Sequence, residues 1–95
     1  MTESLGDREF CTRDIDIANH STHDIYVSVQ VKKRYGNDRE FIIRPGGNEI
    51  WSRLCFYDHN VTIADDKKVH LKTFKLRRGA SNVKYEWDGT TLKKR

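Results

Sequence analysis

A row of cations in residues 67–78 is the strongest chemical feature of the sequence. If this segment is a strand with one β-bulge near Thr73, the side chains pointing away from the core follow one another at about 6.6–6.8 Å. Those side chains are Lys68, His70, Lys72, Lys75 and Arg77. A row at this pitch matches the spacing of successive phosphates on a nucleic acid strand, and it would attract an anionic lipid surface equally well. Outward lysines are also typical of an edge strand protected against aggregation.

The histidines suggest a second kind of site. His20 and His23 share one expected loop with Asp24, and His59 follows Asp58 in another loop that a β-sandwich could bring to the same end. Imidazoles and a carboxylate can hold zinc, but these residues lack the fixed ligand separations of a specific metal motif. The sequence therefore predicts no metal and no cofactor, and a small metal-dependent enzyme stays a minor hypothesis. It also contains no nucleophile elbow and no glycine-rich phosphate loop, so no motif supports catalysis.

Three aromatic residues bear on contact with sugars or lipids. Trp51 shares a strand side with Arg53, Trp87 lies beside an expected hairpin, and Tyr57 lies in a loop. An indole in such a position could stack on a sugar ring or lie at a membrane interface. The alternative is that both tryptophans fill the core, because a domain this small needs large side chains in its interior.

The two cysteines, Cys11 and Cys55, are expected to be free thiols. The sequence shows no secretory leader and no run of roughly 18 apolar residues that would cross a bilayer. These features favour the cytosol or nucleus, where thiols stay reduced. Secretion, and with it a disulfide, is the alternative if a leader was removed.

Length and composition indicate one folded domain. The chain has 95 residues, of which 36% are hydrophobic, 34% charged and 11% aromatic. This mixture, rich in β-branched residues, excludes a disordered chain and a coiled coil. Residues 1–60 contain eight Lys or Arg against ten Asp or Glu, whereas residues 61–95 contain ten against four. The net charge of +4 therefore comes from the last third, which indicates either an acidic partner or simply a soluble surface.

Apolar residues alternate with polar ones along most of the chain, as in half-buried strands. The clearest case is residues 24–34, and turn signals such as Pro45–Gly46–Gly47 and Asp88–Gly89 separate such segments. We expect about eight short strands in an all-β, antiparallel β-sandwich or barrel, with a helix over residues 65–76 as an alternative. The expected organisation is a flexible tail over residues 1–12, a sandwich domain over 13–92 and a basic tail over 93–95.

The leading functional hypothesis is a non-enzymatic binding module whose basic C-terminal face docks on an acidic partner. The partner would be nucleic acid, an anionic lipid surface or an acidic protein. A carbohydrate-binding or membrane-active β-sandwich is the alternative, and pairing through an exposed strand edge leaves no pattern that the sequence alone reveals. Strand order and oligomeric state are not determined by local patterning.

Overall fold

The computed structural model describes residues 11–31, 40–65 and 71–95, and within these ranges the chain is all-β. It contains eight strands: β1 (Thr12–Asn19), β2 (Ile25–Val31), β3 (Phe41–Ile43), β4 (Asn48–Leu54), β5 (His59–Ala64), β6 (Leu71–Leu76), β7 (Val83–Trp87) and β8 (Leu92–Lys94). The fold class expected from the alternating pattern is therefore confirmed. The helix considered over residues 65–76 is wrong, because residues 71–76 form a strand.

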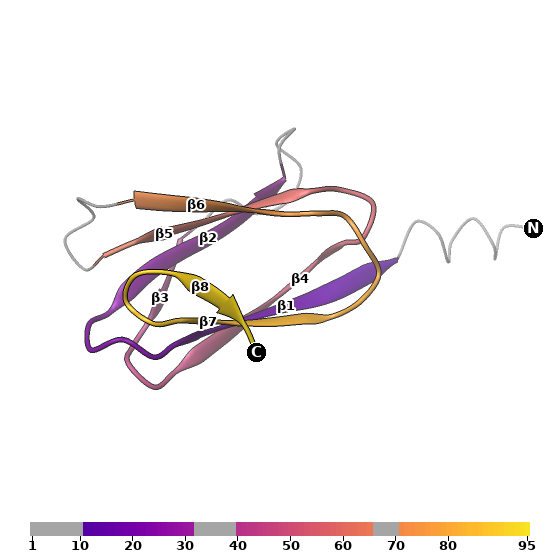
Figure 1. Cartoon of the computed structure of the whole chain (residues 1–95). Coiled ribbons are helices and arrows are strands. Elements are labelled where there is room, and N and C mark those ends of the chain that lie inside the picture. The colour runs from indigo at the N-terminus through magenta and orange to yellow at the C-terminus, as the bar shows by residue number, and fades with distance from the viewer. Residues whose placement is uncertain (1–10, 32–39, 66–70) are drawn as a thin grey trace, which may run out of the picture.

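The strands form two four-stranded sheets that pack face to face (Figure 1). Sheet A has the order β4-β1-β7-β8, and sheet B has the order β3-β2-β5-β6. β1 and β7 run parallel, whereas every other pair of neighbouring strands is antiparallel. The result is a β-sandwich whose loops gather at its two ends.

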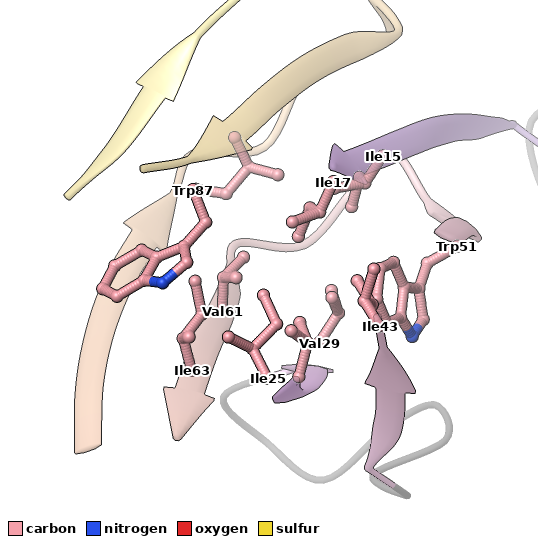
Figure 2. Packing of buried hydrophobic residues seen from close by; sticks show 11 residues of the cluster. Ile15, Ile17, Ile25, Val29, Ile43, Trp51, Val61, Ile63 and Trp87 are labelled. Carbon is pink, nitrogen blue, oxygen red and sulfur yellow. The ribbon is translucent and has the colours of Figure 1, made fainter. Parts of the chain in front are cut away.

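The core lies between the sheets and is built by the period-two alternation. Buried isoleucines and valines of both sheets meet there, and Trp51 and Trp87 lie toward opposite sides of this cluster (Figure 2). Each indole makes an edge-to-face contact with a phenylalanine of the other sheet, Phe41 at 5.8 Å and Phe74 at 6.3 Å between ring centroids. Both tryptophans therefore help to hold the sheets together.

The turn predicted at Pro45–Gly46–Gly47 is present, but it does not close a hairpin. Gly46 has a φ of +85°, which favours glycine, and the Gly47 N–H donates to the Arg44 carbonyl. β3 pairs with β2 in sheet B, whereas β4 pairs with β1 in sheet A. The turn thus carries the chain from one sheet to the other, a topology that local turn chemistry does not encode.

The Asp88–Gly89 signal does mark the β7–β8 hairpin, although its loop is longer than a two-residue turn. Trp87 pairs with Leu92, and the Asp88 N–H donates to the Thr91 carbonyl. The Asp88 carboxylate accepts hydrogen bonds from the N–H groups of Thr90 and Thr91, both at 2.8 Å. An Asp–Gly pair favours a two-residue type I′ turn, but here these hydrogen bonds stabilise a four-residue loop.

The β-bulge predicted near Thr73 is absent. β6 pairs with β5 without interruption from His59↔Leu76 to Ala64↔Leu71. Lys72 is therefore on the core side of β6 with Phe74 and Leu76, whereas Lys75 faces the opposite side. The shift in the apolar pattern has another cause. Lys72 lies near the start of β6, where its Nζ donates to the Thr90 carbonyl of the β7–β8 loop, so a lysine on the core side needs no bulge.

The last residues take part in the sheet. Lys93 and Lys94, assigned to the basic tail from the sequence, belong to β8, and the Arg95 N–H donates to the Lys84 carbonyl at 2.8 Å. The Arg95 side chain forms an ion pair with Asp16 at 2.9 Å. The C-terminal cations are therefore distributed over sheet A.

Candidate functional site

One end of the sandwich is closed by a disulfide between Cys11 and Cys55. β1 and β4 lie side by side, so the residues just beyond the Thr12↔Leu54 pair face each other with a Cα–Cα distance of 5.6 Å. The Cys55 N–H also donates to the Cys11 carbonyl at 3.0 Å. The expectation of free thiols is therefore wrong, because the strand pairing that joins the cysteines spans 44 residues and is invisible to local patterns.

The β4–β5 turn packs against the segment that follows β6 at this same end. The Gly79 N–H donates to the Cys55 carbonyl at 3.1 Å, and the Arg78 N–H donates to the Asp58 carboxylate at 2.7 Å. The Asp58 carboxylate also pairs with the Arg78 guanidinium at 3.4 Å. The hydrogen bond from the Arg78 backbone, helped by the charges of Arg78 and Lys75, holds the pKa of Asp58 below its usual value.

Three exposed cations therefore lie in or just beyond β6 at this end, and two of them, Arg78 and Lys75, act on the Asp58 carboxylate. We call the group Lys75, Arg77 and Arg78 the cationic tip. All three residues are exposed, and the Arg78 side chain keeps 70% of its surface in solvent. Phe56, in the adjoining turn, is 41% exposed. The turn that carries Phe56 is thus hydrogen-bonded to the segment that carries Arg77 and Arg78.

A buried arginine supports the tip from inside. Arg13 is only 4% exposed, and its Nη2 donates to the Arg77 carbonyl at 2.6 Å. Burial lowers the pKa of Arg13 from its usual value. This contact fixes the backbone of Arg77 and adds a further positive group behind the exposed cations.

The row of cations predicted from the sequence does not form one surface in the described part of the chain. Lys68 and His70 lie outside the described residues. Lys72 reaches toward sheet A and donates from Nζ to the Thr90 carbonyl at 2.8 Å. Lys75 and Arg77 remain at the cationic tip, and Arg78, which the sequence analysis did not select, joins them.

The histidines do not converge. His59 is fully buried at the start of β5, opposite Leu76, whereas His20 and His23 are exposed in the β1–β2 loop at the other end of the sandwich. The described residues contain no group of three His, Cys, Asp or Glu able to hold a metal ion. The suggested convergence is wrong because β5 runs antiparallel to β2, which places its first residue far from the β1–β2 loop.

His59 is instead a core histidine. Neither of its ring nitrogens has a hydrogen-bond partner among the described residues. Burial, together with the positive charges of Arg13 and Arg53, lowers the pKa of His59 from 6.5 to about 4. The imidazole is therefore neutral at pH 7 and adds no charge to the tip.

The tryptophans are not available for stacking on a ligand. Trp51 is 4% exposed and Trp87 is 6% exposed, so the suggested sugar or lipid contact through their faces is wrong. Both indoles fill space in the core between the two sheets. Tyr57 is half-buried in the β4–β5 turn, beside the cationic tip.

A cleft of about 610 Å³ lies at the other end of the sandwich. Among the described residues, its lining comprises His20, Ser21, Thr22, His23, Asp24, Ile25, Ile63, Ala64, Asp65, Trp87, Asp88 and Gly89, which include three aspartates but no lysine or arginine. Most of its rim groups already bind their own loops. Asp88 holds the β7–β8 loop, and the Ser21 hydroxyl donates to Asn19 at 2.6 Å.

Asn19 is the residue that shapes this end. It is fully buried, and its side-chain amide donates to the His23 carbonyl at 2.7 Å and to the Ile43 carbonyl at 2.8 Å. The side-chain oxygen of Asn19, Oδ1, accepts a hydrogen bond from the Ser21 N–H. The Asn–x–Ser spacing was a local signal for such a turn, but the bond to Ile43 was not predictable from it.

In the ranges that the structure covers, no helix has the length and apolarity needed to cross a membrane. Comparisons with protein-family models, with curated proteins and with solved structures give no match to this chain. The cationic tip and the cleft are therefore the two candidate sites.

Proposed function

We propose that this protein is a non-enzymatic binding module that docks on an acidic partner through the cationic tip. The supporting observation is that Lys75, Arg77 and Arg78 are exposed within four residues of chain, where Asp58 pairs with only one of them, Arg78. One carboxylate balances one of three cations, so the surface keeps a net positive charge. Such a surface attracts anionic groups over a distance of several ångströms at ordinary salt.

The rigidity of the tip favours binding. The disulfide, the Gly79–Cys55 hydrogen bond and the Arg13–Arg77 hydrogen bond hold its backbone before any partner arrives. A partner then loses less free energy to ordering the site on association. Phe56 and Tyr57 supply apolar contact area next to the charges.

The disulfide also bears on where the protein acts. Stable disulfides are typical of oxidising compartments and rare in the cytosol and nucleus. It supports placing this module outside the reducing cytosol, in place of the cytosolic or nuclear location expected from the sequence. The acidic partner favoured there is an acidic glycan or an acidic protein surface over nucleic acid.

The test is the affinity for a heparin oligosaccharide, a single-stranded oligonucleotide and phosphatidylserine vesicles, each measured as salt rises. The double variant Lys75→Glu/Arg77→Glu is compared with Lys84→Glu/Lys94→Glu, which changes the net charge equally on sheet A, away from the tip. We expect binding that weakens with salt and falls at least about tenfold more in the tip variant than in the control. Equal losses in the two variants, or no binding to any of the probes at low salt, would overturn the proposal.

The cleft is a second candidate site, for a carbohydrate. Its described lining combines apolar residues such as Ile63 and Ala64 with hydroxyl, imidazole and carboxylate groups, and includes no lysine or arginine. That combination suits a neutral sugar, which has apolar ring faces and hydroxyl edges. We place it second because Trp87 is nearly buried and Asp88 is held by its own loop.

Glycan binding by the wild-type protein and by Asp24→Asn tests the cleft. Asp24 lines it, and the amide keeps the size of the side chain while removing the charge. Binding of a neutral glycan that weakens in Asp24→Asn supports the cleft. Silence across a glycan array removes this candidate.

A further inference from the structure

The sandwich has four edge strands among the described residues, and one of them, β4, is protected only by two inward-facing charges of opposite sign, Glu49 and Arg53. β4 and β8 are the edges of sheet A, and β3 and β6 are the edges of sheet B. β3 and β8 have only three residues each, and β6 carries Lys72 and Lys75. Short edges and edge lysines are common ways to prevent strand addition.

β4 has none of these features. It has seven residues, contains no proline or lysine, and pairs with β1 without a bulge from Ala18↔Asn48 to Thr12↔Leu54. Ile50, at the centre of the strand, is 56% exposed. A long, regular edge with an exposed apolar residue favours pairing with another strand.

The backbone groups on the free side of β4 can be assigned from the hydrogen bonds at its two ends. The Asn19 N–H donates to Gly47, and the Cys55 N–H donates to Cys11, so the odd-numbered positions bond to β1. The N–H and C=O groups of the even-numbered positions therefore point away from β1. Those positions are Asn48, Ile50, Ser52 and Leu54, and no other described strand lies beside them.

The side chains of β4 are complementary to those of a second β4 running in the opposite direction. Glu49 and Arg53 flank Trp51 symmetrically on the core-facing side of the strand. If two copies pair antiparallel about an axis at Trp51, Glu49 faces the partner's Arg53 in both directions. The same register sets Ile50 opposite the partner's Ser52, and both of these residues have backbone groups on the free side.

The charges of Glu49 and Arg53 favour the β4 strand of a second copy over an arbitrary peptide as the partner strand. Glu49 has no ion-pair partner among the described residues, and the Arg53 guanidinium is partly buried, where it donates to the Val29 carbonyl at 3.2 Å. In the proposed register, the Glu49 carboxylate of each copy lies opposite the Arg53 side chain of the other, without any change in sequence. The arrangement is a two-fold, isologous interface, the commonest kind in homodimers.

We propose that this chain forms a homodimer by antiparallel pairing of β4 with the partner's β4, which joins the two A sheets into one eight-stranded sheet. The interface is distinct from the cationic tip, and it leaves Lys75, Arg77 and Arg78 accessible on each copy. Because β4 runs toward the tip and the partner's β4 runs the opposite way, the two tips lie at opposite ends of the dimer, where each can contact an acidic group.

The first test is the mass of the protein by sedimentation equilibrium over a wide concentration range. The variant Ile50→Lys places two like charges near the axis, and Ile42→Lys is the matched control, because Ile42 is 52% exposed on β3 of the other sheet. We expect a dimer whose dissociation constant rises about tenfold or more in Ile50→Lys but stays unchanged in Ile42→Lys. Circular dichroism verifies that both variants keep the strand content of the wild type.

A cysteine cross-link tests the register. In the proposed dimer, Ile50→Cys on one copy faces Ser52→Cys on the other, at a separation of about 5.5 Å between Cα atoms. A mixture of the two variants should cross-link faster under mild oxidation than either variant alone. A monomer at every concentration, an equal effect of the two lysine variants, or equal cross-linking in all samples would overturn the proposal.

Discussion

Both ends of the sandwich consist of loops that join strands of the two sheets, but their polar groups have different roles. At the cationic tip, a disulfide, a backbone hydrogen bond and the side chains of Arg13 and Asp58 fix the loops, and the charged ends of Lys75 and Arg77 stay in solvent. At the cleft, the side chains themselves fix the loops. The side chains of Asn19 and Asp88 form hydrogen bonds with backbone groups of the loops around them.

This difference indicates which end is available to a partner. A polar group already bonded to its own loop must break that bond before it can bind a ligand, which reduces the gain in free energy. The exposed cations of the tip have less to give up, because water is their main competitor.

Removal of the disulfide should have the largest effect on stability. In the double variant Cys11→Ala/Cys55→Ala, the unfolded chain gains the freedom of a loop spanning 44 residues, worth about 4 kcal/mol. Urea unfolding of the two proteins measures the difference. The reductant dithiothreitol should lower the stability of the wild type and leave that of the variant unchanged. Equal stability of the wild type with and without reductant would contradict the covalent closure of the tip.

Asn19→Ala should have the next largest effect and should act at the cleft end. The variant leaves the carbonyls of His23 and Ile43 without the amide that donates to them, at a cost of about 2–3 kcal/mol. Urea unfolding measures this loss, and affinity for an acidic probe should not change. Ser21→Ala is a milder control because it removes only the hydroxyl. A loss of acidic binding in Asn19→Ala would break the proposed independence of the two ends.

Stability should fall between pH 8 and pH 5 because of His59. Its pKa is lowered from 6.5 to about 4 in the folded protein, so the unfolded chain binds the proton first as the pH falls. Folding therefore loses about 2 kcal/mol by pH 5, with the remaining loss complete below pH 4. Urea midpoints across this range measure the effect, and His59→Gln should flatten the profile above pH 5. A wild-type profile that is flat from pH 8 to 5 would show that His59 is not buried as a neutral group.

Ion pairing at the tip should have the smallest effect. Asp58→Asn removes the carboxylate that partly neutralises the tip, while the amide oxygen can still accept from the Arg78 N–H. We expect affinity for a heparin oligosaccharide to rise a few-fold, equivalent to less than about 1 kcal/mol, because exposed ion pairs are weak. Asp14→Asn, on the outer side of sheet A, changes the net charge equally and serves as the control. A rise of the same size in the control would assign the effect to net charge alone.

Local patterns predicted much of the fold and less of the site. Alternation over residues 24–34 and the Pro45–Gly46 turn correctly indicated strands and a reversal, because both depend on near neighbours in sequence. The Cys11–Cys55 bond and the Arg78–Asp58 pair depend instead on which strands become neighbours. Hydrophobic alternation carries no information about that choice, which explains why it did not predict that Lys72 reaches sheet A while Lys75 and Arg77 lie at the tip.

The most direct test of docking through the cationic tip is to map where a short acidic ligand contacts the protein. Two-dimensional amide NMR spectra of the ¹⁵N-labelled protein, titrated with a heparin oligosaccharide at low salt, report this residue by residue. We predict that the largest shifts occur in residues 56–58 and 75–79, around the cationic tip, and that they fade as salt is added. Shifts concentrated in residues 20–24, 63–65 and 87–89 would place binding in the cleft and contradict the proposed function.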